Sequence, residues 1–266
     1  MMTQAVDFKE ECDAIHELLA PLEDADFQRV TQFKAWTIDD IMQHLHFFNV
    51  MADLSVQDEE RFVAEYGVMR RAREEGGETL LEATDRLLDH ARGRDLLDQW
   101  RAYYPDMAAR FRAADPKMRV KWAGPDMSVR SSITARLMET WSHAQAIYDV
   151  LGVERVNTDR IKNICVMGVN TFGWTFVNRG EDVPEDLPYL RLVAPSGALW
   201  EWGEVSEANC IEGPAEGFCQ VVTQTRNVAD TDLNVTGDVA NRWMAVAQCF
   251  AGPARTPPAP GQRQPA

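Results

Sequence analysis

Residues 136–152, RLMETWSHAQAIYDVLG, have the pattern of a helix that is apolar over most of its circumference. Glu139 and His143 lie four residues apart on one side of this helix, where their neighbours are small or apolar. The other side carries a stripe of apolar residues at helical spacing, namely Ile133, Leu137, Trp141, Ala144, Tyr148 and Leu151. The helix therefore places two ionisable side chains on a face that otherwise favours burial.

Burial of these two groups without partners is costly, because charges and unsatisfied donors lose their hydration inside a protein. A divalent metal removes the cost, since it takes a carboxylate oxygen of Glu139 and an imidazole nitrogen of His143 from adjacent helical turns. A hydrogen bond between Glu139 and His143 in a packed core removes it equally well. The helix alone leaves both explanations open.

A second helix begins after Thr37, which forms a capping-box pattern with Asp40 and predicts a helix to about Val56. His44 shares a face with apolar residues, whereas His46 lies on the side of three polar residues, Asp39, Asn49 and Asp53. We therefore predict that His44 faces the core and that His46 is solvated. A single core histidine is usually structural, but Glu139 and His143 make His44 a candidate ligand.

Periodic apolar residues predict further helices over residues 8–19, 96–111 and 158–176, with shorter ones between residues 57 and 92 that break at Gly76-Gly77. Strand-like segments at residues 189–193, 198–202 and 233–236 alternate with helical stretches at 214–223 and 238–250, which is typical of a small α+β domain. The predicted domains are residues 1–182 and 183–252. Residues 253–266, rich in Pro and Gly, are predicted to be a disordered tail.

Composition limits the classes of partner. The formal net charge of −15 argues against nucleic acid, which needs a concentrated basic face, and against adsorption to an anionic membrane. The N-terminal residues lack the pattern of a signal peptide, and no apolar run reaches the roughly 20 residues of a membrane helix. The 5 cysteines are scattered and form no C-x-x-C pair, so we expect free, buried thiols in a cytoplasmic protein.

Together, His44, Glu139 and His143 supply ligands from two helices of an antiparallel bundle, as metal sites in helical bundles do. Two imidazoles and one carboxylate leave coordination positions for water or substrate, which is typical of a catalytic site. Zinc is the default ion for this donor set, and iron, nickel or cobalt would also fit.

The segments WTIDDIMQHL (Trp36–Leu45) and ARLMETWSH (Ala135–His143) resemble the DinB-like metal-binding proteins, above all the mycothiol-dependent maleylpyruvate isomerase branch. Further motifs at Leu192–Gly203 and Ala247–Pro253 resemble an uncharacterised metal-binding subfamily, so the resemblance extends almost to the end of the chain. It implies a mainly α fold, in which a four-helix bundle is followed by a small α+β domain. It also implies that His44, Glu139 and His143 bind the metal and that a low-molecular-weight thiol is the cofactor.

Other polar groups are weaker candidates for catalysis. Arg136 and Arg242 could each hold an anionic substrate group, but surface salt bridges are the more common role for such residues. Asp40 lies one turn before His44 and could orient that imidazole or act as a base, or it could only cap its helix. Trp36 and Trp122 could line a pocket or belong to the core.

The sequence therefore predicts a thiol-dependent transferase or isomerase that acts on a small electrophilic or carboxylate substrate. A metal-dependent hydrolase, with water in place of the thiol, is a variant of this hypothesis. The alternative is a non-catalytic protein that binds a metal or a small molecule, and a bundle without metal is the least favoured. The sequence leaves open whether the chain forms a homo-oligomer.

Overall fold

The computed structural model describes residues 2–265, which form two compact units. The first unit ends at Val150 and the second begins at Leu151. No helix among the described residues is long and apolar enough to cross a membrane. All the cysteines are free and buried, as predicted.

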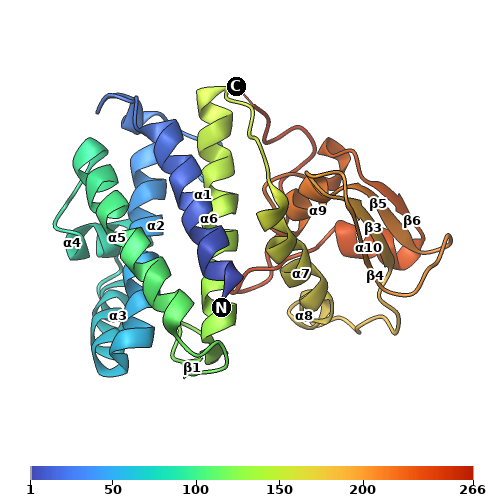
Figure 1. The fold of residues 1–266 in the computed structure, drawn as a ribbon, viewed down its shortest axis with the longest axis horizontal. Coiled ribbons are helices and arrows are strands. Elements are labelled where there is room, and N and C mark those ends of the chain that lie inside the picture. Colours follow the sequence, from blue (N-terminus) through green and yellow to red (C-terminus); the bar gives the residue numbers. More distant parts are fainter. Residues whose placement is uncertain (1, 266) are drawn as a thin grey trace. The chain divides into compact units, whose positions relative to one another are not determined.

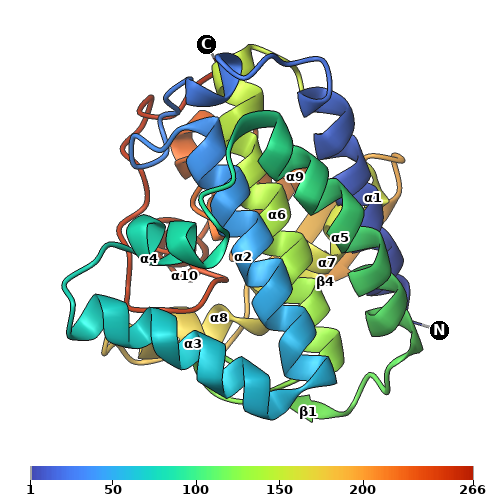
Figure 2. The same ribbon diagram turned by 90° about the vertical axis from the view of Figure 1, so that its left-hand side faces the viewer.

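The first unit is helical. Its long helices are α1 (Thr3–Leu19), α2 (Ile38–Gln57), α5 (Gly93–Ala113) and α6 (Val129–Leu151), and these run side by side as a bundle (Figures 1 and 2). Two shorter helices, α3 (Glu59–Glu74) and α4 (Leu80–Leu87), connect α2 to α5 and lie to one side of the bundle (Figure 2). A short hairpin of β1 (Arg119–Val120) and β2 (Met127–Ser128) leads into α6.

The bundle core contains apolar side chains from all four long helices. Fully buried examples are Phe8 and Ile15 of α1, Ile41 and Leu45 of α2, Trp100 and Met107 of α5, and Leu137 and Trp141 of α6. Each set recurs at helical spacing, so burial of one stripe per helix holds the bundle together. The predicted four-helix bundle is confirmed.

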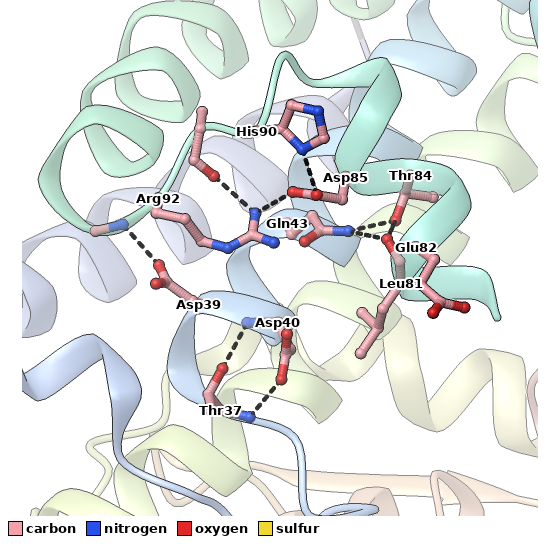
Figure 3. A network of polar contacts seen from close by, with 12 residues as sticks. Thr37, Asp39, Asp40, Gln43, Leu81, Glu82, Thr84, Asp85, His90 and Arg92 are labelled. Carbon is pink, nitrogen blue, oxygen red and sulfur yellow. Dashed lines mark hydrogen bonds and ion pairs between the residues drawn. The ribbon is translucent and has the colours of Figure 1, made fainter. Parts of the chain in front are cut away.

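The start of α2 is fixed by polar contacts (Figure 3). Thr37 and Asp40 form the predicted capping box. Asp39 accepts a hydrogen bond of 2.7 Å from the backbone N–H of Gly93, at the beginning of α5. Gln43 donates to the Leu81 carbonyl at 2.7 Å, which ties α4 to the same helix. These bonds hold α2 in a fixed position relative to α4 and α5.

The second unit is the predicted small α+β domain. Its helices are α7 (Lys162–Asn170), α8 (Phe172–Val177), α9 (Ala215–Val222) and α10 (Asp238–Met244). Its strands are β3 (Tyr189–Val193), β4 (Leu199–Trp202), β5 (Cys210–Pro214) and β6 (Asn234–Thr236), in the sheet order β4-β3-β5-β6. Strands β3 and β5 are parallel, and the other neighbouring pairs are antiparallel. The sequence did not predict β5, and the helix expected over residues 158–176 is divided at Thr171.

The two units meet between Val150 and Leu151, whereas the predicted boundary lies after residue 182. Helix α7 packs against α9 of the second unit: the Sγ atoms of Cys165 and Cys219 lie 3.4 Å apart, and Gly168 faces Phe218. Residues 253–265 contain no helix or strand, but Asn227 donates a hydrogen bond to the Pro258 carbonyl at 2.8 Å. The structure thus packs this stretch, which we expected to be a disordered tail, against the second unit.

Candidate metal centre

Helices α2 and α6 bring His44, Glu139 and His143 together. The Nε2 atom of His143 lies 3.1 Å from Oε2 of Glu139, and the Nε2 atom of His44 lies 3.8 Å from the same oxygen. One potential ligand atom from each side chain lies within 4.8 Å of those from the other two. The three side chains selected from the sequence therefore converge on one point.

The spacing suits a divalent ion. Atoms that bind one tetrahedral ion at about 2.0–2.2 Å lie about 3.4 Å from one another, and the two observed distances of 3.1 and 3.8 Å lie on either side of that value. The side chains of His44, His143 and Glu139 are 11%, 11% and 28% exposed, so solvent reaches the cluster. The donor set fits a metal that keeps a coordination position for an exchangeable ligand.

Charge and burial set the protonation of the cluster. Burial lowers the pKa of His44 to about 4, with a further contribution from the nearby His143, so the imidazole is neutral at neutral pH. Burial alone would raise the pKa of Glu139, but the hydrogen bond with His143 and the proximity of His44 outweigh it and hold that pKa well below its usual range. Neutral imidazoles and an ionised carboxylate are the forms that bind metals.

Aromatic rings pack around the two imidazoles. The ring of Trp36 is stacked on His143 at a centroid distance of 6.1 Å and lies 5.4 Å from His44. Phe33 contacts His143 edge-on at 4.9 Å, and Phe48 lies 4.8 Å from His44. The Nδ1 atom of His44 is buried and has no hydrogen-bond partner within residues 2–265, so ring packing orients this imidazole. Of these three aromatic residues, only Trp36 was recognisable from the sequence as a candidate pocket residue; Phe33 and Phe48 were missed.

Phe33 and Trp36 belong to a tight turn in an unusual conformation. Lys34 and Ala35 have φ angles of 54° and 55°, in the left-handed region that favours glycine. Each non-glycine residue in this region costs about 1–2 kcal/mol. Such strain is concentrated at functional sites, where the position of a side chain matters more than stability. The turn could not be predicted from local sequence, since residues 31–37 contain neither glycine nor asparagine.

Arg136 lies between the two helices that carry the cluster. It is 2% exposed, so the expectation of a surface salt bridge is wrong for this residue. Its Nε donates to Oδ1 of Asn49 at 3.0 Å, and its Nη2 donates to the carbonyl of Leu45 at 3.3 Å. Burial lowers the pKa of Arg136 to about 10, so the guanidinium remains charged at neutral pH. Arg136 thus links α6 to α2 next to His44.

The other weak candidates have structural partners. The carboxylate of Asp40 accepts a hydrogen bond of 2.8 Å from the backbone N–H of Thr37, within the capping box. Arg242, on α10, forms an ion pair of 3.0 Å with Glu181, and both side chains are well exposed. Trp122 lies 6.2 Å from Phe48 and stacks on Phe62, so it is one ring removed from the histidines. The structure therefore gives Asp40 the role of a helix cap and Arg242 that of a surface ion pair.

His46 is buried, contrary to the prediction that it is solvated. It is 5% exposed, and its ring faces Tyr103 of α5 at 5.6 Å. Helix α5 covers the polar side of α2. There, Asp53 of α2 accepts hydrogen bonds from Arg110 and Tyr103 of α5. The prediction failed because polar residues that have partners on a distant helix look, in sequence, like a solvent-facing surface.

Comparison with known proteins adds independent observations. The family described as "Mycothiol maleylpyruvate isomerase N-terminal domain" matches residues 8–148. An uncharacterized protein in two strains of Mycobacterium tuberculosis is 34% identical over 247 residues, which cover 93% of this chain and 95% of that protein. The crystal structure of the mycothiol-dependent maleylpyruvate isomerase and that of one of its mutants superpose with TM-scores of 0.51 and 0.50. Both are 14% identical to this chain and cover 82% of it and 87% of their own length, so this likeness concerns the fold.

Proposed function

The chain belongs to the mycothiol maleylpyruvate isomerase N-terminal domain family, and on that premise we propose that it is a metal-dependent enzyme that uses a low-molecular-weight thiol. We propose His44, Glu139 and His143 as the metal ligands and zinc as the ion, with nickel, iron or cobalt able to fit the same donors. The reaction would be a transfer or an isomerisation of a small electrophilic or carboxylate substrate.

One observation carries this proposal. The two imidazole Nε2 atoms lie 3.1 and 3.8 Å from a single carboxylate oxygen, while the side chains remain partly exposed. A purely structural pair of Glu139 and His143 does not need a third side chain from another helix. A closed structural metal site would have a fourth protein ligand, and among residues 2–265 the group that could hold an ion consists of these three side chains.

A divalent ion held by these residues would lower the pKa of a bound thiol and polarise a carbonyl of the substrate. The protein supplies the geometry. Arg136 donates to the Leu45 carbonyl, next to His44, and so fixes the distance between α2 and the two ligands on α6. Phe33, Trp36 and Phe48 surround the imidazoles with apolar rings, which limits water around the thiol and strengthens electrostatic interactions there.

Free, buried cysteines suit a reducing compartment, so we also propose a cytoplasmic location. The hydrolytic variant requires a general base next to the metal. Asp40, the base considered from sequence, is hydrogen-bonded in the capping box, and we therefore favour thiol chemistry.

Thiol binding tests the proposal. The chain, loaded with cobalt as a visible probe, is titrated with 2-mercaptoethanol and, in parallel, with ethanol. We expect the thiol to produce a sulfur-to-cobalt charge-transfer band and ethanol to produce none. The same band must be absent from the Glu139→Ala variant. A loaded wild-type protein without a thiol-dependent band would overturn the thiol role and favour the non-catalytic alternative.

A further inference from the structure

The two parallel strands of the second unit end beside each other. In the sheet order β4-β3-β5-β6, Val193 at the end of β3 pairs with Pro214 at the end of β5. The chain leaves β3 toward β4 on one side of this pair, and it leaves β5 through α9 toward β6 on the other side. Connections that diverge in this way leave a crevice at the carboxyl ends of parallel strands, where open α/β sheets bind their ligands.

A cavity lies at these carboxyl ends. Its volume is about 480 Å³, which is within the range of pockets that bind small molecules. It lies entirely within the second unit. The residues that line it are Asn157, Val193, Ala194, Pro195, Gly213, Pro214 and Glu216.

The backbone around the cavity is held in place by its own contacts. The carboxylate of Asp159 accepts hydrogen bonds from the backbone N–H of Ser196 at 3.0 Å and from its hydroxyl at 2.7 Å, which fixes the turn that contains Pro195. On the other side, Gly213 has a φ of 137°, and a Cβ there would lie 2.6 Å from the carbonyl oxygen of Asp232. Because these walls are already ordered, a ligand would bind without the cost of ordering them.

Most of the lining is apolar. Val193 is 46% exposed, and Leu199, its partner across the β3–β4 pair, is 50% exposed. Side chains that are paired across antiparallel strands lie on the same face, so the apolar surface continues from the cavity onto β4. Pro195 and Pro214 add to the apolar lining. A contiguous apolar surface of this kind suits the hydrocarbon part of a ligand.

Among the residues that line the cavity, Glu216 carries the ionisable side chain. It is partly buried in the first turn of α9, and its Oε1 accepts a hydrogen bond of 3.2 Å from Gln220. A carboxylate accepts about four hydrogen bonds, so Glu216 has capacity for a further donor. Burial raises the pKa of Glu216, although the Asn157 amide and two nearby arginines act in the opposite direction. A bound cation would offset this cost of burial.

We propose that the cavity at the carboxyl ends of β3 and β5 binds a small primary amine, whose ammonium pairs with Glu216 and whose apolar body lies on Val193 and the two prolines. An ammonium group has three donors and no acceptor, which matches a carboxylate that can accept more hydrogen bonds. An anion would face Glu216, and the formal net charge of −15 favours the approach of a cation. This site goes beyond the proposed function and does not depend on the metal centre.

The test follows the backbone amide signals of the full-length chain by NMR during titration with 2-phenylethylamine and with 2-phenylethanol, in which a hydroxyl replaces the ammonium. We expect the signals of Val193, Ala194 and Glu216 to shift. The amine should bind about two- to fivefold more tightly than the alcohol, the size of an exposed ion pair. Glu216→Gln should abolish this preference. The matched control is Glu212→Gln, which removes an exposed carboxylate of β5 that pairs with Arg191 and should keep the preference.

Two further measurements separate the parts of the proposal. Val193→Ser should weaken the binding of the amine and of the alcohol by the same factor, because it removes only apolar contact. The affinity for the amine should be equal in zinc-free and zinc-loaded protein. Equal affinities of the wild type for the two probes, or an unchanged preference in a folded Glu216→Gln variant, would overturn the role of Glu216. A requirement for zinc would place the amine at the metal centre and overturn the site itself.

Discussion

His44 and His46 lie on opposite faces of one helix, and the contrast between them shows what makes a histidine a ligand candidate. His46 is buried and His44 is largely buried, burial lowers the pKa of each to about 4, and each has an Nδ1 atom without a hydrogen-bond partner among the described residues. His44 faces a carboxylate at 3.8 Å and a second imidazole at a ring distance of 4.5 Å. His46 faces the ring of Tyr103. Burial and a low pKa are therefore common to both, and convergence with other donors distinguishes the two.

The largest expected difference concerns metal affinity. Loss of a residue that only supports a ligand costs about 10–100-fold in affinity, so His44→Ala, which removes a proposed ligand, should cost more than about 100-fold. His46→Gln should leave the affinity within a fewfold of wild type. Glutamine is the better control because His46 is buried and alanine would leave a cavity. Competition with a chromogenic chelator measures both, and equal losses in the two variants would contradict the comparison.

The side of α2 that carries His46 should matter for folding. Asp53 is fully buried and bound to Arg110 and Tyr103, and removal of one partner of a buried pair is strongly destabilising. Because Arg110 is partly exposed, we expect Asp53→Ala to lower the free energy of unfolding by about 2–3 kcal/mol. Urea unfolding gives this value. The metal affinity of the folded variant should be unchanged, and a loss of affinity would show that the two faces are coupled.

Acid should weaken the metal-free protein through His46. The folded-state pKa of about 4 lies below the ordinary value of about 6.5, so between these pH values the unfolded chain binds a proton that the folded chain does not. This contribution to stability is fully present above pH 6.5 and is lost as the pH falls toward 4. Between pH 7.5 and 5.0, the free energy of unfolding of the wild type should therefore fall by about 2 kcal/mol more than that of His46→Gln. Parallel pH dependences of unfolding in wild type and variant would refute this assignment.

The smallest effect concerns the turn beside His44. Ala35 has a φ of 55°, so Ala35→Gly should relieve backbone strain while it adds freedom to the unfolded chain. The balance should raise the free energy of unfolding by about 0.5 kcal/mol, measured by urea denaturation of the metal-free protein. If Ala35→Gly instead lowered the free energy of unfolding by more than about 1 kcal/mol, the left-handed turn would carry no strain.

The sequence was sufficient for the bundle and for the three converging side chains because both depend on helical spacing. Glu139 and His143 are one turn apart, and His44 shares the apolar face of α2, so a single rule of geometry places all three. The resemblance of the segments around these residues to a known family led to the same fold.

The features that were missed depend on contacts between distant residues or on backbone conformation. His46 was misplaced because the partners that bury its side of the helix, Tyr103 and Arg110, lie on α5. Strand β5, with the sequence CIEGP, lacks the alternation of a strand and is specified by pairing with β3 on one side and β6 on the other. The turn at Lys34 and Ala35 contains no residue that favours a positive φ, so local sequence could not predict it.

The metal content of the wild-type chain tests the central claim most directly. The protein would be purified without added metal and without a metal-affinity tag, and its divalent ions would be determined by elemental analysis. We predict about one ion per chain, retained after dialysis and lost from Glu139→Ala. A folded wild-type chain that contains no ion, and that takes up neither zinc nor cobalt on titration, would contradict the account and leave Glu139 and His143 as a structural pair.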